Sequence, residues 1–313
     1  MNKLLRIIII FFVIVLAAGS VSNFLEAMNW PSENAVLVRN FGANNSGKPV
    51  LGMIFAGETE ILAVENGEVI FSRSEKDTAS RLPSPLGSWT AIDHGDGLIS
   101  IYGRYDESNR IITSYGAEDL ENQIDKQQQI AFSGISGWSV QEGFYFKLFD
   151  RRERRWINPA MIIAPVQETR PPQILSVSLR NTQGLAVQTN NLTQGRYTVV
   201  VNIAGGTPVY PASRGFGSAV TASLSSNQYA PQRIYCSVNG AEVGSLNFEA
   251  VFARDGVQMV SRNGLVPARQ IYAYSPAYEA AEVFLNRGQA RLEVIVHDRS
   301  GNSHNTVLQL TVN

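Results

Sequence analysis

The sequence predicts an all-β protein with two domains. The chain has 313 residues, which is long enough for two separate hydrophobic cores. From Asn34 onward, short runs of apolar, aromatic and β-branched residues alternate with polar ones, and Gly, Asn and Asp separate these runs. A sustained helical periodicity is hard to find. We therefore expect sheets throughout.

Residues 34–165 are predicted to form the first β-domain. Its clearest element is Trp89–Tyr105, where two alternating runs flank His94-Gly95-Asp96-Gly97. Asp-Gly between β-favouring runs is a strong hairpin signal, so we expect two strands and a tight turn here. The other runs with the length and residue types of strands are VLVRNFG, TEILAVENGEVIFS, QIAFSGIS and GFYFKLF.

Residues 173–313 are predicted to form a second domain. The segment APVQETRPP ends in Pro171-Pro172, a stiff and non-helical pair that indicates a linker. Beyond it the spacing of strands and turns is typical of an immunoglobulin-like β-sandwich. The strand-like runs are ILSVSLR, RYTVVVNIA, RIYCSV, SLNFEAVF, AEVFLN, ARLEVIVHD and NTVLQLTV.

Residues 1–27 have the properties of an export signal. Lys3 and Arg6 precede the apolar run Ile7–Ala18, which is short for a hydrocarbon layer of ~30 Å. We expect a signal peptide, with an uncleaved N-terminal membrane anchor as the alternative. Either implies that the protein is exported to the periplasm or cell envelope.

Composition excludes several classes of function. A net charge of −1 does not favour nucleic-acid binding, which needs a basic field to match the phosphates. Cys236 is the only cysteine, so the chain has no disulfide framework and no cysteine metal site. The densest charge run, Asp150–Arg155, is interpreted as a solvated hairpin end, with a contact for an anionic partner as the alternative.

Several segments in order resemble the lysostaphin/LytM-type zinc endopeptidases, which cut peptidoglycan cross-links. The central hairpin, with Asp-His-Gly before the turn and Tyr-x-x after it, is similar to the family's own hairpin. The resemblance covers residues 34–165 and extends to the runs ETEILAVENGEVIFS, which keeps Ala63, Gly67 and Val69, and QIDKQQQIAFSG, and to the closing Asn158-Pro159.

The positions that match the family's zinc ligands carry other residues in this chain. Val50 and Ile54 stand in place of a histidine and an aspartate, Arg104 in place of another histidine, and Phe144 and Phe146 in place of a His-x-His pair. Zn²⁺ needs imidazole, thiolate or carboxylate donors, which these side chains lack. Period two would put both phenylalanines on the floor of the site. The resemblance thus implies an inactive domain, not an enzyme, without a metal or other cofactor.

Family members that have lost their ligands regulate cell-wall amidases, so the resemblance implies a protein that binds peptidoglycan or regulates a cell-wall hydrolase. A membrane contact is expected only through an uncleaved N-terminal segment. The candidate groove contacts are Tyr102, Arg104, Tyr145 and Lys147. Two alternatives remain open: an active peptidoglycan endopeptidase with an unrecognised metal site, and a structural or adhesive envelope protein.

Overall fold

The computed structural model describes residues 27–75, 84–106, 122–163, 171–204 and 229–313. Residues 1–26, which hold almost all of the predicted signal or anchor, and linker residues 164–170 lie outside the described residues. Within the described residues, none of the helices has both the length and the apolar character needed to span a bilayer. Nearly all regular structure is strand, so the all-β prediction is confirmed.

The first lobe is built around one central strand, β12 (Gly143–Asp150). One edge pairs antiparallel with β8 (Leu98–Gly103), and the other pairs first with β4 (Met53–Ala56) and then with β13 (Arg155–Ile157). The sheet continues from β8 through β7 (Trp89–Asp93), β6 (Gly67–Arg73) and β10 (Gln123–Ile124), while β1 (Val36–Arg39) pairs with β4. A second, three-stranded sheet holds β5 (Glu60–Leu62), β11 (Gln129–Ser133) and β9 (Tyr105–Asp106).

The predicted central hairpin is confirmed as β7 and β8. Asp93 pairs with Ile99 across the turn, and the His94 amide donates to the Leu98 carbonyl at 2.9 Å. Asp96 and both turn glycines adopt positive φ angles. This backbone conformation explains the Gly-Asp-Gly sequence, since Gly adopts it without steric cost and Asp tolerates it.

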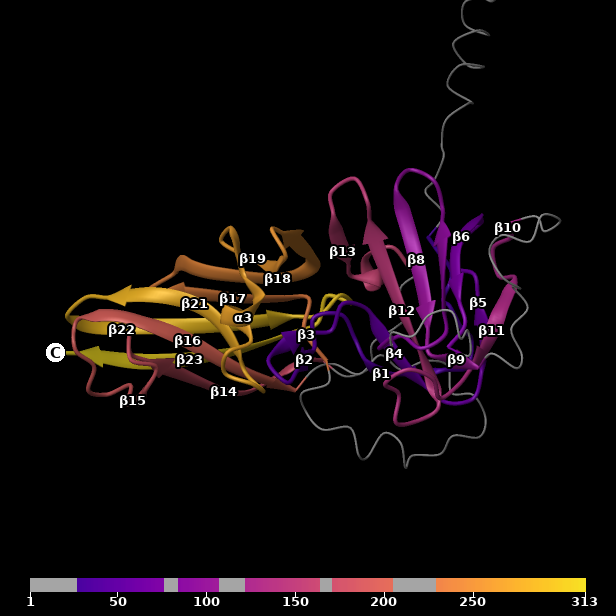
Figure 1. Ribbon diagram of the computed structural model, residues 1–313. Helices are drawn as coiled ribbons and strands as arrows, with labels where there is room; N and C mark the ends of the chain where they lie inside the picture. Colours follow the sequence, from indigo (N-terminus) through magenta and orange to yellow (C-terminus); the bar gives the residue numbers. More distant parts are fainter. Residues whose placement is uncertain (1–26, 76–83, 107–121, 164–170, 205–228) are drawn as a thin grey trace, which may run out of the picture.

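The second lobe is a β-sandwich (Figure 1). A four-stranded sheet, in the order β15-β14-β16-β21, faces a sheet that includes β18, β17, β22 and β23. Its core draws buried side chains from both sheets, Cys236 among them. The elements are β14 (Gln173–Arg180), β15 (Ala186–Val187), β16 (Gly195–Ala204), β17 (Arg233–Val238), β18 (Ala241–Arg254), β19 (Val257–Arg262), β20 (Leu265–Pro267), α3 (Ala268–Ile271), β21 (Tyr278–Leu285), β22 (Gly288–His297) and β23 (Ser303–Val312).

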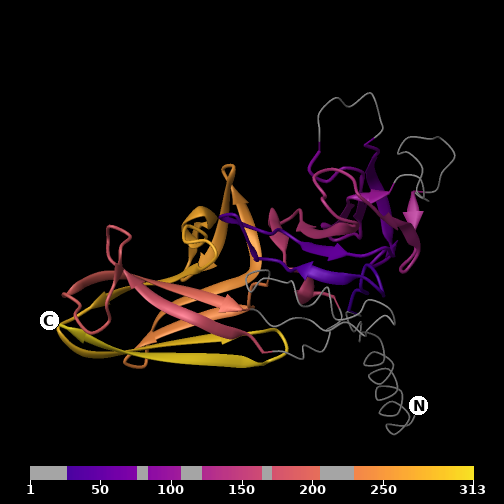
Figure 2. The same ribbon diagram turned by 90° about the horizontal axis from the view of Figure 1, so that it is seen from below.

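One hydrogen-bonded sheet runs through both lobes. Strand β13 pairs with β12 on one edge and with β18 on the other, where Trp156 lies opposite Val251. Asn158, which caps the short 3-10 helix η2 (Pro159–Met161), donates from its side chain to the Phe248 carbonyl at 3.0 Å. The two lobes therefore meet side by side in both views (Figures 1 and 2).

Residues 41 and 42 of the first lobe lie against the core of the second lobe. They lead into the small hairpin of β2 (Asn44–Asn45) and β3 (Lys48–Pro49). Phe41 is fully buried among the side chains of the sandwich. Gly42 follows at φ +80°, and a Cβ there would lie 2.6 Å from Phe248. The Tyr272 hydroxyl donates to the Gly42 carbonyl at 2.6 Å. We call residues 41 and 42 the latch, because they connect the first lobe to the core of the second.

Because Phe41 lies in the sandwich core, we expect this first-lobe residue to stabilise the second lobe. Phe41→Ala should lower the free energy of unfolding by about 3–5 kcal/mol, because it leaves a cavity in the sandwich core. Phe284→Ala, at a side chain that is more than half exposed, is the matched control and should change stability little. Urea denaturation followed by fluorescence checks both. A small effect of Phe41→Ala on the transition of the second lobe would show that the latch is dispensable.

Candidate functional site

Strand β12 sends alternate side chains to opposite faces of its sheet. Phe144 and Phe146 point into the core of the first lobe, with exposed fractions of 1% and 0%. Phe144 stacks on Phe55 with ring centroids 4.6 Å apart, and Phe146 packs against Tyr102 at 5.2 Å. The strand register places the same pairs opposite each other. These rings are core residues.

The sequence predictions for Phe146 on β12 and for Tyr102 on the neighbouring strand β8 are wrong for that reason. Phe146 does not form the floor of a groove, because its face of the sheet is the core face. Phe144 packs in the same core and only borders the groove described below. Tyr102 is also fully buried, and its hydroxyl accepts a hydrogen bond from the Val64 amide at 3.0 Å, so it cannot contact a ligand. A shift of one residue in a strand exchanges its two faces, which explains the error.

The opposite face of the same strands carries Ile54, Tyr145 and Lys147. Ile54 lies opposite Tyr145 in the β4–β12 register. The Arg104 guanidinium lies 5.4 Å from the centre of the Tyr145 ring, and Lys147 Nζ lies 4.7 Å from the same ring. Lys147 Nζ is also 4.9 Å from the Trp156 ring. The structure thus brings together three of the four predicted contacts, Arg104, Tyr145 and Lys147.

Val50 and Ile54, the other two positions that match zinc ligands of the family, do not lie together. Ile54 shares the face of Tyr145, whereas Val50 is 4% exposed and lies beyond the end of β3. Between them, Gly52 lies against β12 so closely that a Cβ would be 2.2 Å from the Phe146 carbonyl oxygen. The next residue back, Leu51, donates its amide to the Tyr145 hydroxyl at 3.2 Å. This close approach fixes the position of the Tyr145 ring.

Arg104 is held by its backbone at the end of β8. Its φ of +68° lies in the left-handed region, which is uncommon for a residue with a side chain. Its amide donates to the carbonyls of Leu86 and Ser88 at 2.7 and 2.9 Å, and its Nε donates to the Pro85 carbonyl at 3.5 Å. Burial lowers the pKa of the guanidinium, and the nearby charge of Arg39 lowers it further, while Tyr145 opposes the shift.

A groove of about 510 Å³ lies beside this cluster. Arg39 and Arg104 line it, together with Ile54 and the loop after β11, where Trp138 and Val140 are 68% and 96% exposed. Tyr145 and Lys147 are not part of its lining, so they lie outside it, next to Arg104. The remaining lining residues are Val38, Asn45, Phe55, Ala56, Ser139, Gln141, Glu142 and Phe144.

The side chains at this face do not fit a zinc ion. Ile54 offers no donor atom, and Arg104 stays protonated and carries a positive charge. Burial raises the pKa of Tyr145 to about 12, which keeps the phenol neutral. The Lys147 ammonium adds a second positive charge. Within the described residues, His, Cys, Asp and Glu form no cluster of three or more that could hold a metal ion.

The three histidines of the chain lie away from the groove. His94 is in the β7–β8 turn, where Nδ1 donates to the Asn66 carbonyl and Nε2 accepts from the Ser100 hydroxyl, both at 2.7 Å. Burial lowers the pKa of His94, so it is a neutral turn residue. His297 and His304 lie in β22 and β23 of the second lobe.

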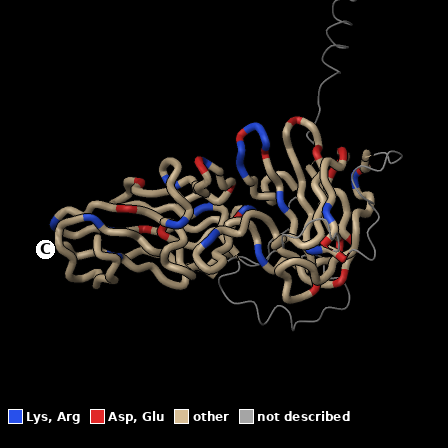
Figure 3. Tube along the Cα trace, in the orientation of Figure 1, with Lys and Arg blue, Asp and Glu red and all other residues tan. Residues whose placement is uncertain are grey.

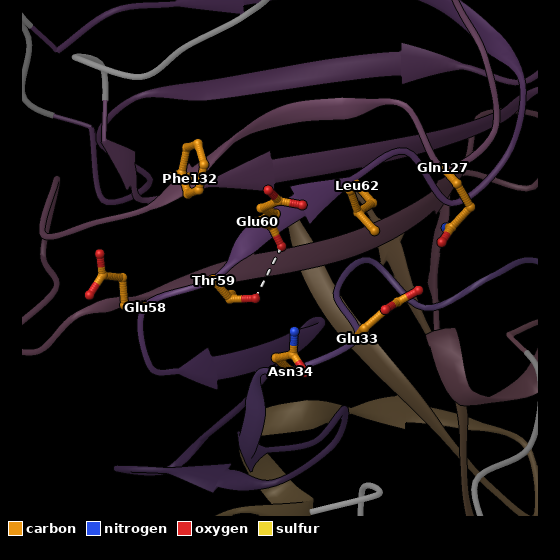
Figure 4. A pocket seen from close by; sticks show the side chains of 8 residues that line it. All are labelled: Glu33, Asn34, Glu58, Thr59, Glu60, Leu62, Gln127 and Phe132. Carbon is orange, nitrogen blue, oxygen red and sulfur yellow. Dashed lines mark hydrogen bonds between the residues drawn. The ribbon is translucent and has the colours of Figure 1, made fainter. Parts of the chain in front are cut away.

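Another hollow, of about 560 Å³, lies at the sheet of β5 and β11. Its glutamates are Glu33, Glu58 and Glu60, and Figure 4 shows them spread around the rim rather than directed at one point. The side-chain hydroxyl of Thr59 donates to the Glu60 carbonyl at 3.3 Å. Because the carboxylates do not converge, this hollow lacks the arrangement of a cation site.

The basic run Asp150–Arg155 forms the tip of the β12–β13 hairpin (Figure 3). Arg151 pairs with Asp93 at 3.3 Å and Arg152 with Asp96 at 2.6 Å, both from the neighbouring β7–β8 tip. Exposed pairs of this kind contribute little to stability. Arg151 and Arg152 thus have carboxylate partners within the protein, which supports the interpretation of a solvated hairpin end.

Sequence reasoning did not identify Arg39, Trp138 and Trp156 as residues of this site. Arg39 and Trp156 come from strands far apart in the chain, and only the pairing of β1 with β4 and of β13 with β12 brings them to this part of the sheet. For Trp138 the sequence does offer a signal of exposure. This aromatic residue stands in the Gly- and Ser-rich stretch SGISGWSV, which supplies no strand for it to pack against.

Comparison with known proteins gives one family-model match, over residues 171–313, which is less than half of the chain. No curated protein matches. Among solved structures, the catalytic domain of a mutant of the prophage-encoded M23 protein EnpA from Enterococcus faecalis is 20% identical, with 42% of this chain and 94% of that chain covered and a TM-score of 0.33.

Two further solved structures are similar. The SpoIIQ–SpoIIIAH pore-forming complex gives 15% identity over 44% of this chain and 92% of that chain, with a TM-score of 0.33. The antimicrobial peptidase lysostaphin from Staphylococcus simulans gives 13% identity over 87% of this chain and 88% of that chain, with a TM-score of 0.29. Two of these three structures are of peptidases, an M23 protein and lysostaphin.

The partly buried Lys147 should titrate well below the range of an exposed lysine. Burial, and then the charge of Arg104, lower the pKa of Lys147 to about 8. The Tyr145 and Trp156 rings offset part of the lost hydration of the ammonium. A pH titration of the ¹³Cε resonance of Lys147 should therefore show a midpoint near 8, and Arg104→Gln should raise that midpoint. A midpoint near that of an exposed lysine would contradict the described burial.

The same shift has a consequence for stability, with a definite sign. The unfolded chain holds the lysine proton up to about pH 10.4, whereas the folded chain releases it near 8. Between these values the unfolded state binds more protons, so stability rises with pH. Denaturation at several pH values should show that the wild type gains stability over this window relative to Lys147→Met.

Proposed function

We propose that this chain is a catalytically inactive, exported envelope protein that binds peptidoglycan or regulates a cell-wall hydrolase. The observation that carries the proposal is the exchange of the metal-binding face for a cationic and aromatic one. Arg104 stands at a position where the resemblance of residues 34–165 implies a zinc ligand, and Lys147 lies against the same Tyr145 ring as Arg104. Two positive charges repel a metal cation and attract the carboxylates of peptide stems.

The groove also suits binding without turnover. Peptide hydrolysis needs a group that activates water, such as a metal-bound hydroxide or a general base. Arg104 stays protonated, the Tyr145 phenol is neutral, and His94 is held in a distant turn. Lys147, whose pKa of about 8 would suit a general base, lies outside the lining of the groove. The exposed Trp138 and Val140 provide an apolar wall against which a sugar or peptide can pack.

The test separates recognition from stability. Arg104→Glu should weaken co-sedimentation with purified peptidoglycan sacculi by about tenfold or more, because it replaces a charge-assisted contact with repulsion. Its unfolding midpoint should stay close to that of the wild type. Phe146→Ala should instead lower the free energy of unfolding by about 3–5 kcal/mol, since its ring is fully buried.

Arg287→Glu, an equal charge reversal at an exposed residue of the second lobe, is the matched control and should bind as the wild type does. The same incubations should release no soluble peptidoglycan fragments. Equal binding by Arg104→Glu and the wild type would place recognition outside the groove. Fragment release by the purified protein would disprove the proposal that the chain is inactive.

A further inference from the structure

The two arginines of the groove lack carboxylate partners among the described residues. Arg39 donates from Nη1 to the Asn45 side-chain oxygen at 2.6 Å, and Arg104 donates from Nε to the Pro85 carbonyl. Each guanidinium carries five N–H donors in a planar fork, so most donors on both side chains remain for another partner. The arginines of the neighbouring hairpin tip, Arg151 and Arg152, each have a carboxylate partner.

These two guanidinium groups converge on one groove although they repel each other. Both line it, and the charge of Arg39 lowers the pKa of Arg104. Arg39 is oriented by the Asn45 side chain and Arg104 by its backbone at positive φ and by the Tyr145 ring. Two partly buried like charges that line one groove repel each other, and an anion bound between them would offset that repulsion.

The other residues that line the groove limit which chemical groups can lie next to the anionic group of the ligand. Val38, Ile54 and Ala56 give the groove a narrow apolar wall, with Val140 and Trp138 at its edge. Small apolar side chains next to a carboxylate match this surface, whereas a bare phosphate would leave the wall unused. Glu142 adds a negative charge to the lining and disfavours ligands with many negative charges.

We infer that Arg39 and Arg104 form a clamp for the free C-terminal carboxylate of a short peptide with small apolar side chains. This inference rests on the proposed function and makes it more specific: the groove distinguishes a free chain end from one that is linked through an amide bond. An amide carries no charge and loses the charge-assisted contacts to both guanidinium groups. In peptidoglycan, such a site would select stems that are not cross-linked.

The test uses the full chain and two matched probes, N-acetyl-Ala-Ala-Ala as the free acid and as the C-terminal amide. Isothermal titration should show that the wild type binds the acid at least about tenfold more tightly than the amide. Arg39→Gln and Arg104→Gln should each weaken binding of the acid to the level of the amide. Arg287→Gln should keep the full preference for the acid.

Several outcomes overturn the inference. Equal affinity for acid and amide would exclude a carboxylate clamp, and displacement of the acid by equimolar inorganic phosphate would indicate a general anion site. If sacculi bind through Arg104 while neither tripeptide binds, the clamp is wrong and the proposed function stands. If sacculi do not bind and the acid is still preferred through both arginines, the clamp stands and the proposed cell-wall target is wrong.

Discussion

The pairing of strand β12 on both edges is the constraint on which the rest of the structure depends. With β8 on one side and β4 and β13 on the other, the strand cannot shift its register without breaking three pairings. The face of the sheet to which each side chain of β12 points is therefore fixed. Phe144 and Phe146 complete the core, and the same backbone holds Tyr145 and Lys147 on the opposite face. Core and candidate site are two faces of one strand.

That strand also links the site to the second lobe. Trp156 packs against the Lys147 ammonium, its strand β13 pairs with β18, and its ring packs on the sandwich core. Leu51, whose amide bonds the Tyr145 hydroxyl, packs on the same core. The residues next to the groove are thus positioned partly by the second lobe, so the sandwich supports the site as well as extending the sheet.

Local patterns in the sequence predicted much of the fold. The alternation in Trp89–Tyr105 and its Asp-Gly turn specified a hairpin, and the runs beyond Pro171-Pro172 specified a sandwich, because these signals depend on neighbours in the chain. The site was harder, since the face to which a side chain points depends on pairing partners far away. The strand GFYFKLF alternates large side chains on both faces, so only the register with β4 and β8 shows that Tyr145, and not Phe144, shares a face with Ile54.

We propose that positive charges keep metal ions away from this face, and metal analysis tests this proposal most directly. Purified full-length protein is incubated with excess Zn²⁺, passed through a desalting column and analysed for bound metal, alongside Arg104→His. We expect far less than one zinc per chain in the wild type, because Arg104 and Lys147 repel the cation. About one zinc per chain, lost when Arg104 or Tyr145 is substituted, would contradict it.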